Sequence, residues 1–474
     1  MTRVLLFGIE PLPDDGTNTH LAAAGLRTWH LLTAIRAAGH DVILLTNRTF
    51  GAYSENLPAI VERRDRGFVH LSIDDTRWHD PRRMRELVTA IGADGAVATT
   101  LTAGSAATNT VSDLPLWVDL YGDPMAEAQL KAALYRDDDQ LIHYWQQLIS
   151  VLRRGDVFST VSQSQQCSTV GALGTTGRLN QCSVGYTFVH CIPAASDSSP
   201  FPVAAKVIRG QIVPPDAFVI LHSGGFNTWT DVDCLFEAVS RLMEKQPQVY
   251  LIATGGTITG HDDHTYRRFE RLIEGSPFRD RFVLQGWIST TDLPAYYSAS
   301  DVAVCADRRG YEPQLGSRTR VLDWLRAELP CILSTQPELA QDLAQKGGAM
   351  IYSPEDADAL LDHLCWCVEH PVELRQIGKR GQEVLSDCYS YHATAQPLLT
   401  WLQKPSHAPD YGSSVTLFRP AQTLGRQLRR SIQKRRLTLA LGMQLWSKIA
   451  PLTPPMIQRF LVRIGFRALR LKQR

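Results

Sequence analysis

The residues best suited to chemistry lie near position 320, in the segment YEPQLGSRTRVLDWLRAELP at 311–330. Ser317 immediately precedes an amphipathic helical pattern, and the backbone N–H groups at the start of a helix favour an anion. Arg318 and Arg320 add two guanidinium groups to the first turn, where the helix dipole would favour acids. A bound phosphate group would explain this placement. Pairing of the arginines with Asp323 or with surface acids is the alternative.

Two carboxylates belong to the same segment. Asp323 follows Arg320 by three residues, so it lies one turn deeper on the helix, where it could accept both hydroxyls of a ribose. A salt bridge to Arg320 or Arg326 is the alternative. Glu312 lies in the preceding loop and could contact a sugar hydroxyl, unless it is a solvated loop acid.

A glycine-bearing loop, HSGGFNTWTD at 222–231, follows an expected strand. Gly224 and Gly225 permit a close approach of the backbone to a ligand. Asn227 supplies a polar group at the same place. Asp231 is a natural N-cap for the helix that follows, and capping alone would explain it.

Two further features lie in the first half of the chain. The loop at 8–25 exceeds the length of about 12–15 residues beyond which loops in compact domains are usually functional. It closes on Gly25 at a helix start, which suits an anion or a substrate. Asp119 and Asp123 flank a tyrosine after an expected strand, and carboxylates at the carboxyl end of a strand are typical of a ligand cleft.

The elements that must position these residues follow an alternating pattern. Apolar runs typical of buried strands alternate with helical patterns, which argues for parallel α/β sheets. The expected strands are 3–7, 41–45, 68–73, 95–98, 116–119, 157–161 and 189–192, then 218–222, 249–253, 281–285, 302–305, 331–334 and 349–352. Ligands bind such sheets in a crevice at the carboxyl ends of the strands.

A Ser/Pro/Ala-rich stretch at 194–202 separates the two series of strands. We therefore expect an α/β fold of two doubly wound Rossmann-like domains plus a basic helical C-terminal tail. The expected divisions are 1–195, 205–395, a crossing-helix end and linker at 396–412, and the tail at 413–474.

The composition excludes several classes of protein. Of the 474 residues, 44% are hydrophobic and 20% charged, which excludes a long disordered chain, a collagen and a small disulfide scaffold. Nine cysteines without a CxxC pair indicate reduced thiols in a cytoplasmic protein. We find no signal peptide and no stretch that could span a bilayer. The metal-like HDDH at 261–264 lacks an ordered ligand spacing, so no metal site is expected.

The net charge of +1 hides an asymmetry. Residues 411–474 carry 14 Lys/Arg and no Asp/Glu, which leaves 49 less 14, or 35, basic residues against 48 acidic ones in the rest. Helical patterns occur at 420–449 and 455–472, and the second combines an apolar face with a basic face, which is typical of a helix on an anionic membrane surface. Packing of the tail on the acidic body and binding of nucleic acid are the alternatives; without a recognition module we expect no nucleic acid.

No Walker A, GxGxxG or GxSxG motif occurs, so NTPase, classical dehydrogenase and α/β-hydrolase classes lack support. Over roughly residues 3–400 the chain instead resembles the GT-B glycosyltransferases of family 4, which are retaining enzymes with nucleotide-sugar donors. The resemblance rests on GHDVILLT, HSGGFNTWTD, LQGWISTTDLPAYYSASDVAVCAD and DWLRAELPCILS. The SRTR helix start resembles one branch of that family.

The resemblance assigns roles residue by residue. It implies that the backbone at Gly286 and Trp287 holds the nucleotide base. Of the family's paired glutamates, the second is replaced by Asp323 and the first by Leu315, so Glu312 is the candidate stand-in.

The family's basic diphosphate clamp falls on Gly225 and Thr230, which cannot do that work. Arg318 and Arg320 are therefore the candidates for the missing charge. The loop at 119–123 stands where many members carry a histidine near the reacting sugar.

The function implied is transfer of a sugar, with retention, from a nucleotide diphosphate sugar to an acceptor, without a metal or other cofactor. The acceptor expected is a membrane lipid, a lipid-linked saccharide or a surface-polysaccharide precursor, bound by the first domain of a cytoplasmic protein held at the inner face of the membrane. A nucleotide-sugar epimerase and an inactive scaffold are the alternatives. The catalytic candidates are Asp119, Asp123 and Glu312. The donor-binding candidates are Gly25, Gly224, Gly225, Asn227, Gly286, Trp287, Ser317, Arg318, Arg320 and Asp323.

Overall fold

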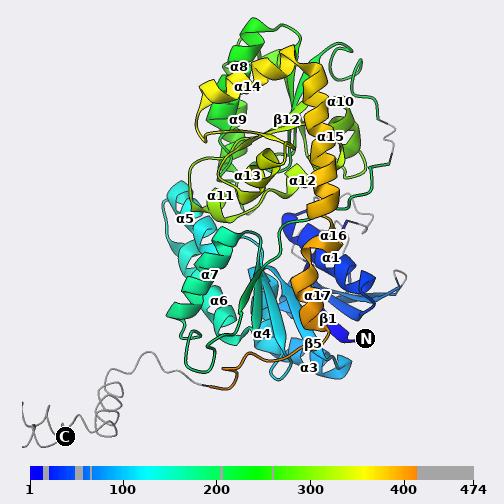
Figure 1. Ribbon diagram of the computed structural model, residues 1–474, viewed down its shortest axis with the longest axis vertical. Coiled ribbons are helices and arrows are strands. Elements are labelled where there is room, and N and C mark those ends of the chain that lie inside the picture. Colours follow the sequence, from blue (N-terminus) through cyan, green and yellow to red (C-terminus); the bar gives the residue numbers. More distant parts are fainter. Residues whose placement is uncertain (14–20, 49–56, 65–66, 203–205, 259–260, 414–474) are drawn as a thin grey trace, which may run out of the picture. The chain divides into compact units, whose positions relative to one another are not determined.

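The computed structural model describes residues 1–13, 21–48, 57–64, 67–202, 206–258 and 261–413 (Figure 1). Residues 1–413 form one compact unit. The basic tail predicted at 413–474 lies outside the described residues from 414 onward, as does the middle of the predicted loop at 8–25.

The first half of this unit is built on an eight-stranded sheet. Neighbouring strands pair in parallel, apart from β3, which pairs antiparallel with β4 at one edge. In pairing order the strands are β3 (Ile60–Arg63), β4 (Val69–Asp74), β2 (Asp41–Arg48), β1 (Arg3–Glu10), β5 (Gly95–Thr99), β6 (Leu116–Leu120), β7 (Val157–Thr160) and β8 (Val189–Cys191).

The second half is built on a six-stranded parallel sheet. Its strands in pairing order are β11 (Phe282–Gly286), β10 (Val249–Thr254), β9 (Phe218–Ser223), β12 (Val302–Cys305), β13 (Cys331–Ser334) and β14 (Met350–Tyr352). The strand order reverses between β9 and β12, and between β1 and β5 in the first sheet. These reversals are the switch points at which open α/β sheets bind ligands.

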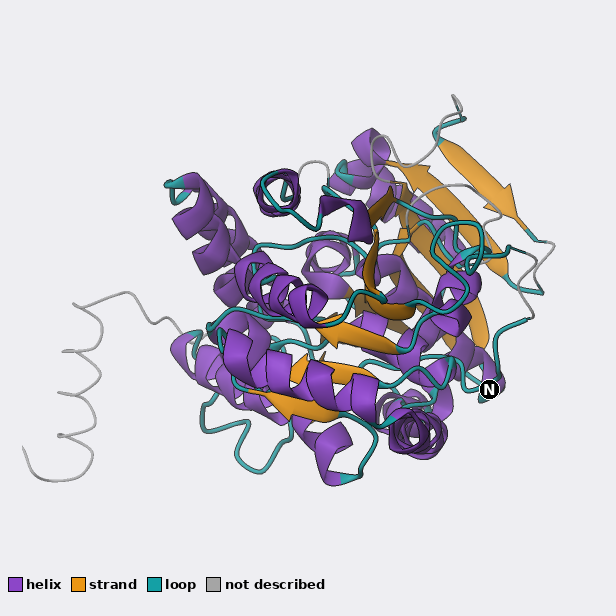
Figure 2. Cartoon of the chain, turned by 90° about the horizontal axis from the view of Figure 1, so that it is seen from above, coloured by secondary structure: helices purple, strands orange, loops and turns teal. Residues whose placement is uncertain are grey.

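Helices connect the strands of both sheets and flank them on both sides (Figure 2). In the first half they are α1 (Ala23–Ala37), α2 (Asp75–Trp78), α3 (Pro81–Ile91), α4 (Thr100–Thr110), α5 (Pro124–Tyr135), α6 (Asp139–Arg154) and α7 (Gln163–Thr175). In the second they are α8 (Val232–Lys245), α9 (His264–Glu274), the short η1 (Arg279–Arg281), α10 (Leu293–Ala299), α11 (Tyr311–Leu315), α12 (Thr319–Arg326), α13 (Glu338–Gln345), α14 (Ala357–Glu369) and α15 (Pro371–Cys388).

The core lies on both faces of each sheet, because the central strands are apolar throughout. In β1, Leu5 and Phe7 enter one hydrophobic cluster, while Val4 and Leu6 enter the cluster on the opposite face. In β9, neighbouring residues likewise divide between two clusters. This arrangement confirms the expected fold class of two doubly wound Rossmann-like sheets.

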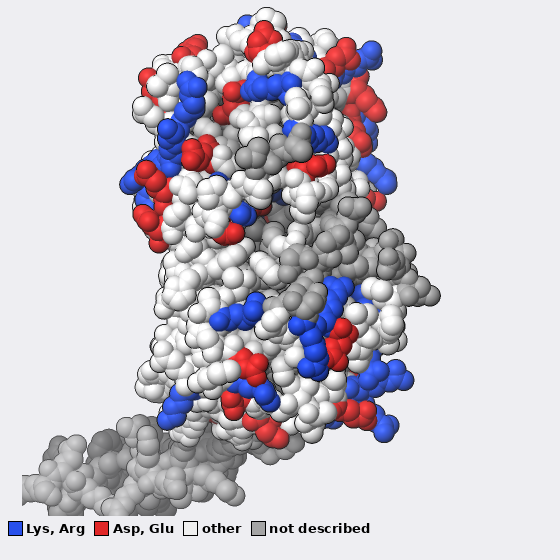
Figure 3. Space-filling model, turned by 90° about the vertical axis from the view of Figure 1, so that its right-hand side faces the viewer, with Lys and Arg blue, Asp and Glu red and all other residues white. Residues whose placement is uncertain are grey.

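After α15 the chain returns to the first half. The short helices α16 (Tyr391–Thr394) and α17 (Gln396–Leu402) follow, and Leu398 and Leu402 pack in the same cluster as Leu31 of α1. On the face of the molecule shown in Figure 3, basic and acidic side chains are interspersed.

The continuous helical pattern at 124–152 forms two helices, because α5 ends at Tyr135 and α6 begins at Asp139. Arg136 between them adopts the left-handed conformation, with φ of 58°. The spacing of hydrophobic residues does not reveal such a local change of backbone conformation.

Candidate functional site

Three glycine-bearing loops meet at the carboxyl ends of β9, β10 and β11. The Gly224 N–H donates to the Thr254 carbonyl at 2.6 Å, and the Gly255 N–H donates to the Gly286 carbonyl at 2.6 Å. A Cβ on Gly255 would lie 2.1 Å from the Gly224 carbonyl oxygen, which no side chain allows. Gly255 also has φ of 111°, a backbone conformation that favours glycine. The loops therefore form a continuous ledge of backbone, which we call the glycine ledge.

Gly225 and Trp287 flank the glycine ledge. A Cβ on Gly225 would lie 2.5 Å from the side chain of Ile258 and 3.2 Å from the Trp287 ring. The Trp287 indole N–H donates to the Thr257 carbonyl at 3.0 Å, which fixes the ring beside the ledge. The structure thus brings Gly224, Gly225, Gly286 and Trp287 together, as the sequence indicated.

Arg320 extends from the first turn of α12 to this ledge. One of its guanidinium NH₂ groups donates to the Gly225 carbonyl at 2.7 Å, and the other lies 3.1 Å from Nε2 of His222. The guanidinium carbon lies 3.4 Å from where a Cβ of Gly224 would stand. Within the described part of the chain, no carboxylate forms an ion pair with Arg320. Burial lowers the pKa of Arg320, because a buried cation without a counter-ion is disfavoured.

His222 supports Arg320 without adding charge. Its Nδ1 lies 3.1 Å from the Val304 carbonyl, so Nδ1 carries the proton and Nε2 accepts from Arg320. Burial of the ring and the neighbouring Arg320 lower the pKa of His222 to about 3. His222 is therefore neutral at physiological pH, and the site carries one uncompensated positive charge at the β9/β12 switch point.

Arg318 was expected to form a phosphate clamp together with Arg320, but its guanidinium is held by two carboxylates. Its Nε donates to both carboxylate oxygens of Asp307 at 3.0 and 3.1 Å, and its NH₂ groups donate to Glu312 at 3.1 and 2.8 Å. The side chain is 5% exposed, and the guanidinium stacks on Trp229 with 5.2 Å between its carbon and the ring centroid. Two carboxylates already neutralise this cation, so Arg318 holds the loop before α12 in place rather than a ligand.

Glu312 consequently differs from its expected role near the sugar. Both of its carboxylate oxygens accept from Arg318, and the side chain is buried. Burial raises the pKa of Glu312, and sharing one guanidinium with Asp307 leaves that rise incompletely offset. Asp307 also accepts from the Ser334 hydroxyl at 3.0 Å.

Asp323 lies one turn after Arg320 on α12 and is half-buried. Its Oδ1 accepts from the Ser196 hydroxyl at 3.1 Å. It forms no salt bridge to Arg320 or Arg326; Arg326 pairs with Asp197 instead. Burial raises the pKa of Asp323 to about 6.

Asn227 and Ser317 have unpaired side chains. Both residues are half-buried, and neither side chain makes a hydrogen bond to another described residue. Both are therefore available to a ligand, as expected.

The carboxylates of the first half have structural partners. Asp119 is fully buried, and its two oxygens accept from Arg27 at 2.9 and 2.7 Å and from the Ser159 hydroxyl at 2.6 Å. Asp123 caps α5 through the backbone N–H groups of Met125 and Ala126. Neither geometry matches the expected catalytic role, since Asp119 has no access to solvent and Asp123 is occupied as a helix cap.

Gly25 has a packing role. It lies inside the first turn of α1, and a Cβ there would lie 2.1 Å from the Pro11 carbonyl oxygen. The residue lets α1 pack against the loop after β1. This close contact differs from the open anion site that the sequence indicated.

Polar contacts join the first half to α11 and α12. The Tyr121 hydroxyl hydrogen-bonds the Thr319 hydroxyl, and the Ser162 hydroxyl donates to the Leu315 carbonyl at 2.6 Å. The helix that carries Arg320 is thus also the helix that contacts the carboxyl end of β6. The sequence did not single out Arg27 and His222, because their partners Asp119 and Arg320 are 92 and 98 positions away. It did not single out Asp307 either, since the fold alone brings this carboxylate to Arg318.

The described residues contain neither a metal-binding cluster nor a membrane-spanning helix. No group of three or more His, Cys, Asp or Glu side chains is arranged to hold a metal ion in this part of the chain. Within the same residues, no helix has both the length and the apolar character needed to cross a bilayer.

Comparison with known proteins identifies the fold. The family described as "Glycosyl transferases group 1" matches residues 217–370, the part that contains the glycine ledge and Arg320. No curated protein matches the sequence.

Solved structures match much more of the chain, each covering 85% of it. Sucrose-phosphate synthase from Thermosynechococcus elongatus is 17% identical, with 98% of its chain covered and a TM-score of 0.65. Anabaena HepE, in complex with UDP and glucose, is 15% identical, with 100% covered and a TM-score of 0.63. A UDP-forming α,α-trehalose-phosphate synthase from Burkholderia vietnamiensis is 11% identical, with 100% covered and a TM-score of 0.61. The chain therefore has the GT-B fold and carries a group 1 glycosyltransferase domain.

Proposed function

We propose that this GT-B chain is a retaining glycosyltransferase of the family 4 type, which moves a sugar from a nucleoside diphosphate sugar to an acceptor. The observation that carries the proposal is Arg320. Its half-buried guanidinium lies beside the glycine ledge at the switch point of the second sheet, held by a neutral histidine and a carbonyl, and no described residue supplies a counter-ion. A diphosphate supplies the negative charge that this position lacks.

The donor is assigned along the glycine ledge. The base lies against the backbone of Gly286 and beside Trp287, and the diphosphate lies between Gly224–Gly225 and Arg320. The ribose lies toward Asp323, whose second carboxylate oxygen has no hydrogen bond within the described residues. The UDP bound to the similar Anabaena structure supports a nucleotide in this domain, although the likeness itself is one of fold.

Transfer then requires one bond exchange at the anomeric carbon of the donor sugar. The bond from that carbon to the β-phosphate oxygen breaks, and the acceptor hydroxyl oxygen bonds to the same face of the carbon. The hydroxyl proton moves to the departing phosphate oxygen. Configuration is retained because the new bond forms on the same face of the carbon as the bond that breaks. Arg320 lowers the barrier by neutralising the charge that develops on the diphosphate. In this proposal no metal or other cofactor takes part.

The acceptor is proposed to bind to the first half, where Tyr121 reaches α12. A membrane lipid, a lipid-linked saccharide or a surface-polysaccharide precursor is the proposed class. The support is the excess of basic residues at 411–474, which would hold the protein on the cytoplasmic side of an anionic membrane.

The test is substitution of Arg320 by glutamine, which removes the charge but keeps an N–H donor for the Gly225 carbonyl. Hydrogen bonds to charged groups contribute about 1.5–3 kcal/mol, so UDP affinity should fall about 10- to 150-fold. Calorimetric titration with UDP measures this change, and turnover of UDP-sugars should fall at least as far. Arg241→Gln, on the exposed side of α8, is the matched control. Undiminished UDP binding in Arg320→Gln would refute the donor site.

A donor-only incubation separates the remaining alternatives. An epimerase would release a nucleotide sugar of changed configuration without any acceptor. An inactive scaffold would bind UDP and leave every donor sugar intact, whatever acceptor is supplied. The inactive scaffold is kept as an alternative because Arg318 and Glu312 neutralise each other.

A further inference from the structure

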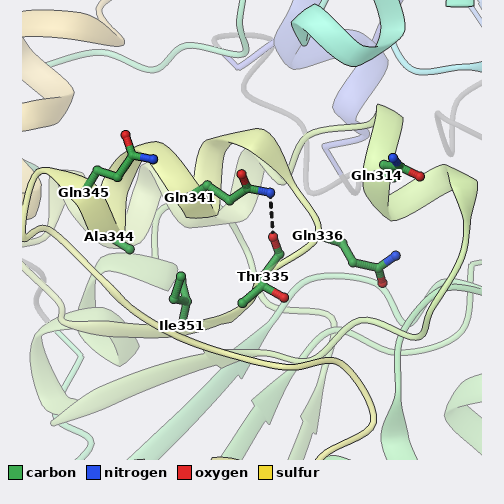
Figure 4. A pocket seen from close by; sticks show the side chains of 7 residues that line it. All are labelled: Gln314, Thr335, Gln336, Gln341, Ala344, Gln345 and Ile351. Atoms are coloured by element: carbon green, nitrogen blue, oxygen red, sulfur yellow. Dashed lines mark hydrogen bonds between the residues drawn. The ribbon is translucent and has the colours of Figure 1, made fainter.

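A second pocket lies beyond the end of β13, away from the glycine ledge. Its volume is about 570 Å³, within the range of about 300–1,000 Å³ that is common for small-molecule sites. Four glutamines line it: Gln314 of α11, Gln336 of the loop after β13, and Gln341 and Gln345 of α13 (Figure 4). We call this the glutamine pocket.

The lining combines hydrogen-bonding groups with no charge. Each carboxamide offers one acceptor oxygen and two N–H donors. Thr335 adds a hydroxyl, while Ala344 and Ile351 add small apolar surfaces, and no acidic or basic side chain lines the pocket. A charged ligand would find no counter-charge in this lining. The lining therefore favours an uncharged ligand with many donors and acceptors.

Gln336 has an acceptor oxygen without a hydrogen-bond partner among the described residues. Its amide nitrogen donates to the Gly310 carbonyl at 3.1 Å, which fixes the carboxamide. Its Oε1 is buried and accepts no hydrogen bond from any described residue. Leaving such an atom unpaired costs about 1–3 kcal/mol. A ligand hydroxyl would recover that cost once the carboxamide turned its oxygen toward the pocket.

The other glutamines are also largely uncommitted. Gln341 donates to the Thr335 carbonyl at 2.9 Å, drawn as the dashed line in Figure 4. The side chains of Gln314 and Gln345 are exposed and make no hydrogen bond within the described residues. Two carboxamide groups, those of Gln314 and Gln345, can therefore turn toward a ligand without breaking a hydrogen bond to another described residue.

We propose that the glutamine pocket binds an uncharged saccharide, as a subsite separate from the donor site at Arg320. Every sugar hydroxyl both donates and accepts, which matches a carboxamide, and the C–H faces of a sugar ring match Ile351 and Ala344. The choice of a saccharide over other uncharged polar ligands rests on the proposed function. The pocket and the donor site lie at the carboxyl edge of the same sheet, so a growing saccharide chain can be held at one while it reacts near the other.

The test titrates the full chain with uncharged oligosaccharides, namely maltotetraose, cellotetraose and chitotetraose, and separately with UDP. At least one oligosaccharide should bind, and the Gln341→Ala/Gln345→Ala double variant should lose at least about tenfold in that affinity. UDP affinity should stay unchanged in the double variant. Gln146→Ala, which removes an exposed carboxamide on α6, is the matched control and should behave as wild type. Equal unfolding midpoints would show that all variants are folded.

Three results would overturn the subsite. One is binding of UDP but of none of the three oligosaccharides, which leaves the donor site standing. Another is saccharide binding that the double variant retains. The third is stronger binding of an anionic oligosaccharide such as trigalacturonic acid. Saccharide binding that the double variant loses, in a protein that does not bind UDP, would support the subsite and refute the donor assignment.

Discussion

At the scale of single residues, Arg318 and Arg320 show how little of a side chain's role lies in its type. They are two positions apart on one helix turn, and Arg318 is buried while Arg320 is half-buried. Arg318 faces Asp307 and Glu312, whereas Arg320 faces His222 and a carbonyl. Arg318 is the counter-ion of two buried carboxylates, whereas Arg320 is a cation without a counter-ion among the described residues.

We predict that the two arginines differ in their effect on stability. Arg318→Met leaves Asp307 and Glu312 buried without a cation, and breaking a buried ion pair costs about 3–5 kcal/mol. Arg320→Met removes a half-buried charge that has no counter-ion among the described residues, so the unfolding midpoint should stay level or rise. Thermal unfolding at pH 7.5 measures both. Equal losses in the two variants would contradict the distinction.

We predict that the Asp323 carboxylate lowers stability at neutral pH and strengthens donor binding. Burial raises its pKa from the ordinary value of 3.8 to about 6, so above that pH the protein holds a carboxylate that folding disfavours. Its contribution to stability is therefore full below pH 3.8 and is lost as pH rises toward 6. Asp323→Asn should raise the unfolding midpoint at pH 7.5, since the amide oxygen still accepts from Ser196.

The same substitution should weaken donor binding. A ribose needs an acceptor carboxylate, so wild-type UDP affinity should fall as pH drops from 7 through 6, while Asp323→Asn should bind weakly and show little pH dependence. UDP titrations across this range measure both slopes. Parallel pH profiles in the two proteins would exclude Asp323 from the ribose site.

The residue-scale site was predictable only in part. The glycines and Arg320 carry local signals, namely a double glycine after a strand and a cation in the first turn of a helix. Arg318 carries the same signal as Arg320, and only the fold shows that Asp307 reaches it. Asp119 illustrates the same limit, because its partner Arg27 is 92 residues away in sequence.

At the scale of elements, the glycine ledge depends on three strand ends meeting without side chains between them. We predict that Gly255→Ala displaces the ledge, because its Cβ would lie 2.1 Å from a backbone oxygen that cannot move aside freely. Both the unfolding midpoint and UDP affinity should fall. Gly39→Ala is the control: its φ is 82° with nothing within 4 Å, so it isolates the conformational cost of about 1 kcal/mol. Normal UDP binding by Gly255→Ala would place the nucleotide elsewhere.

The strands were easier to predict than their borders or the minor elements. Central strands such as β1 and β9 are apolar runs buried on both faces, which is a strong local signal. The edge strand β3 is half-exposed and forms through its pairing with β4, so no such run marks it. The long α15 was also missed, because its two interior glycines, Gly378 and Gly381, weaken a helical pattern and serve close packing instead.

At the scale of the whole molecule, the last described segment packs against the first half of the chain. Residues after α17 return to the first half, where Asp410 pairs with Arg178 at 2.7 and 3.0 Å. Arg178 also donates to the carbonyls of Leu152 and Gly155, and its side chain is 9% exposed. The backbone N–H of Ala408 donates to Asp156 at 2.8 Å. The segment at 403–413 is therefore part of the folded body, and the tail begins after it.

Two truncations test this division together with the proposed role of the tail. A chain ending at Leu402 lacks Asp410, which leaves the buried Arg178 without its counter-ion, so it should lose about 3–5 kcal/mol of stability. A chain ending at Ser413 keeps every one of these contacts and should match the full protein in unfolding midpoint and UDP affinity. It lacks all 14 basic residues of 411–474 that would hold an anionic surface, so sedimentation with phosphatidylglycerol vesicles should capture the full protein only. Capture of both chains alike would move the membrane contact to the body, and retention of the full midpoint by the shorter chain would remove Asp410 from the core.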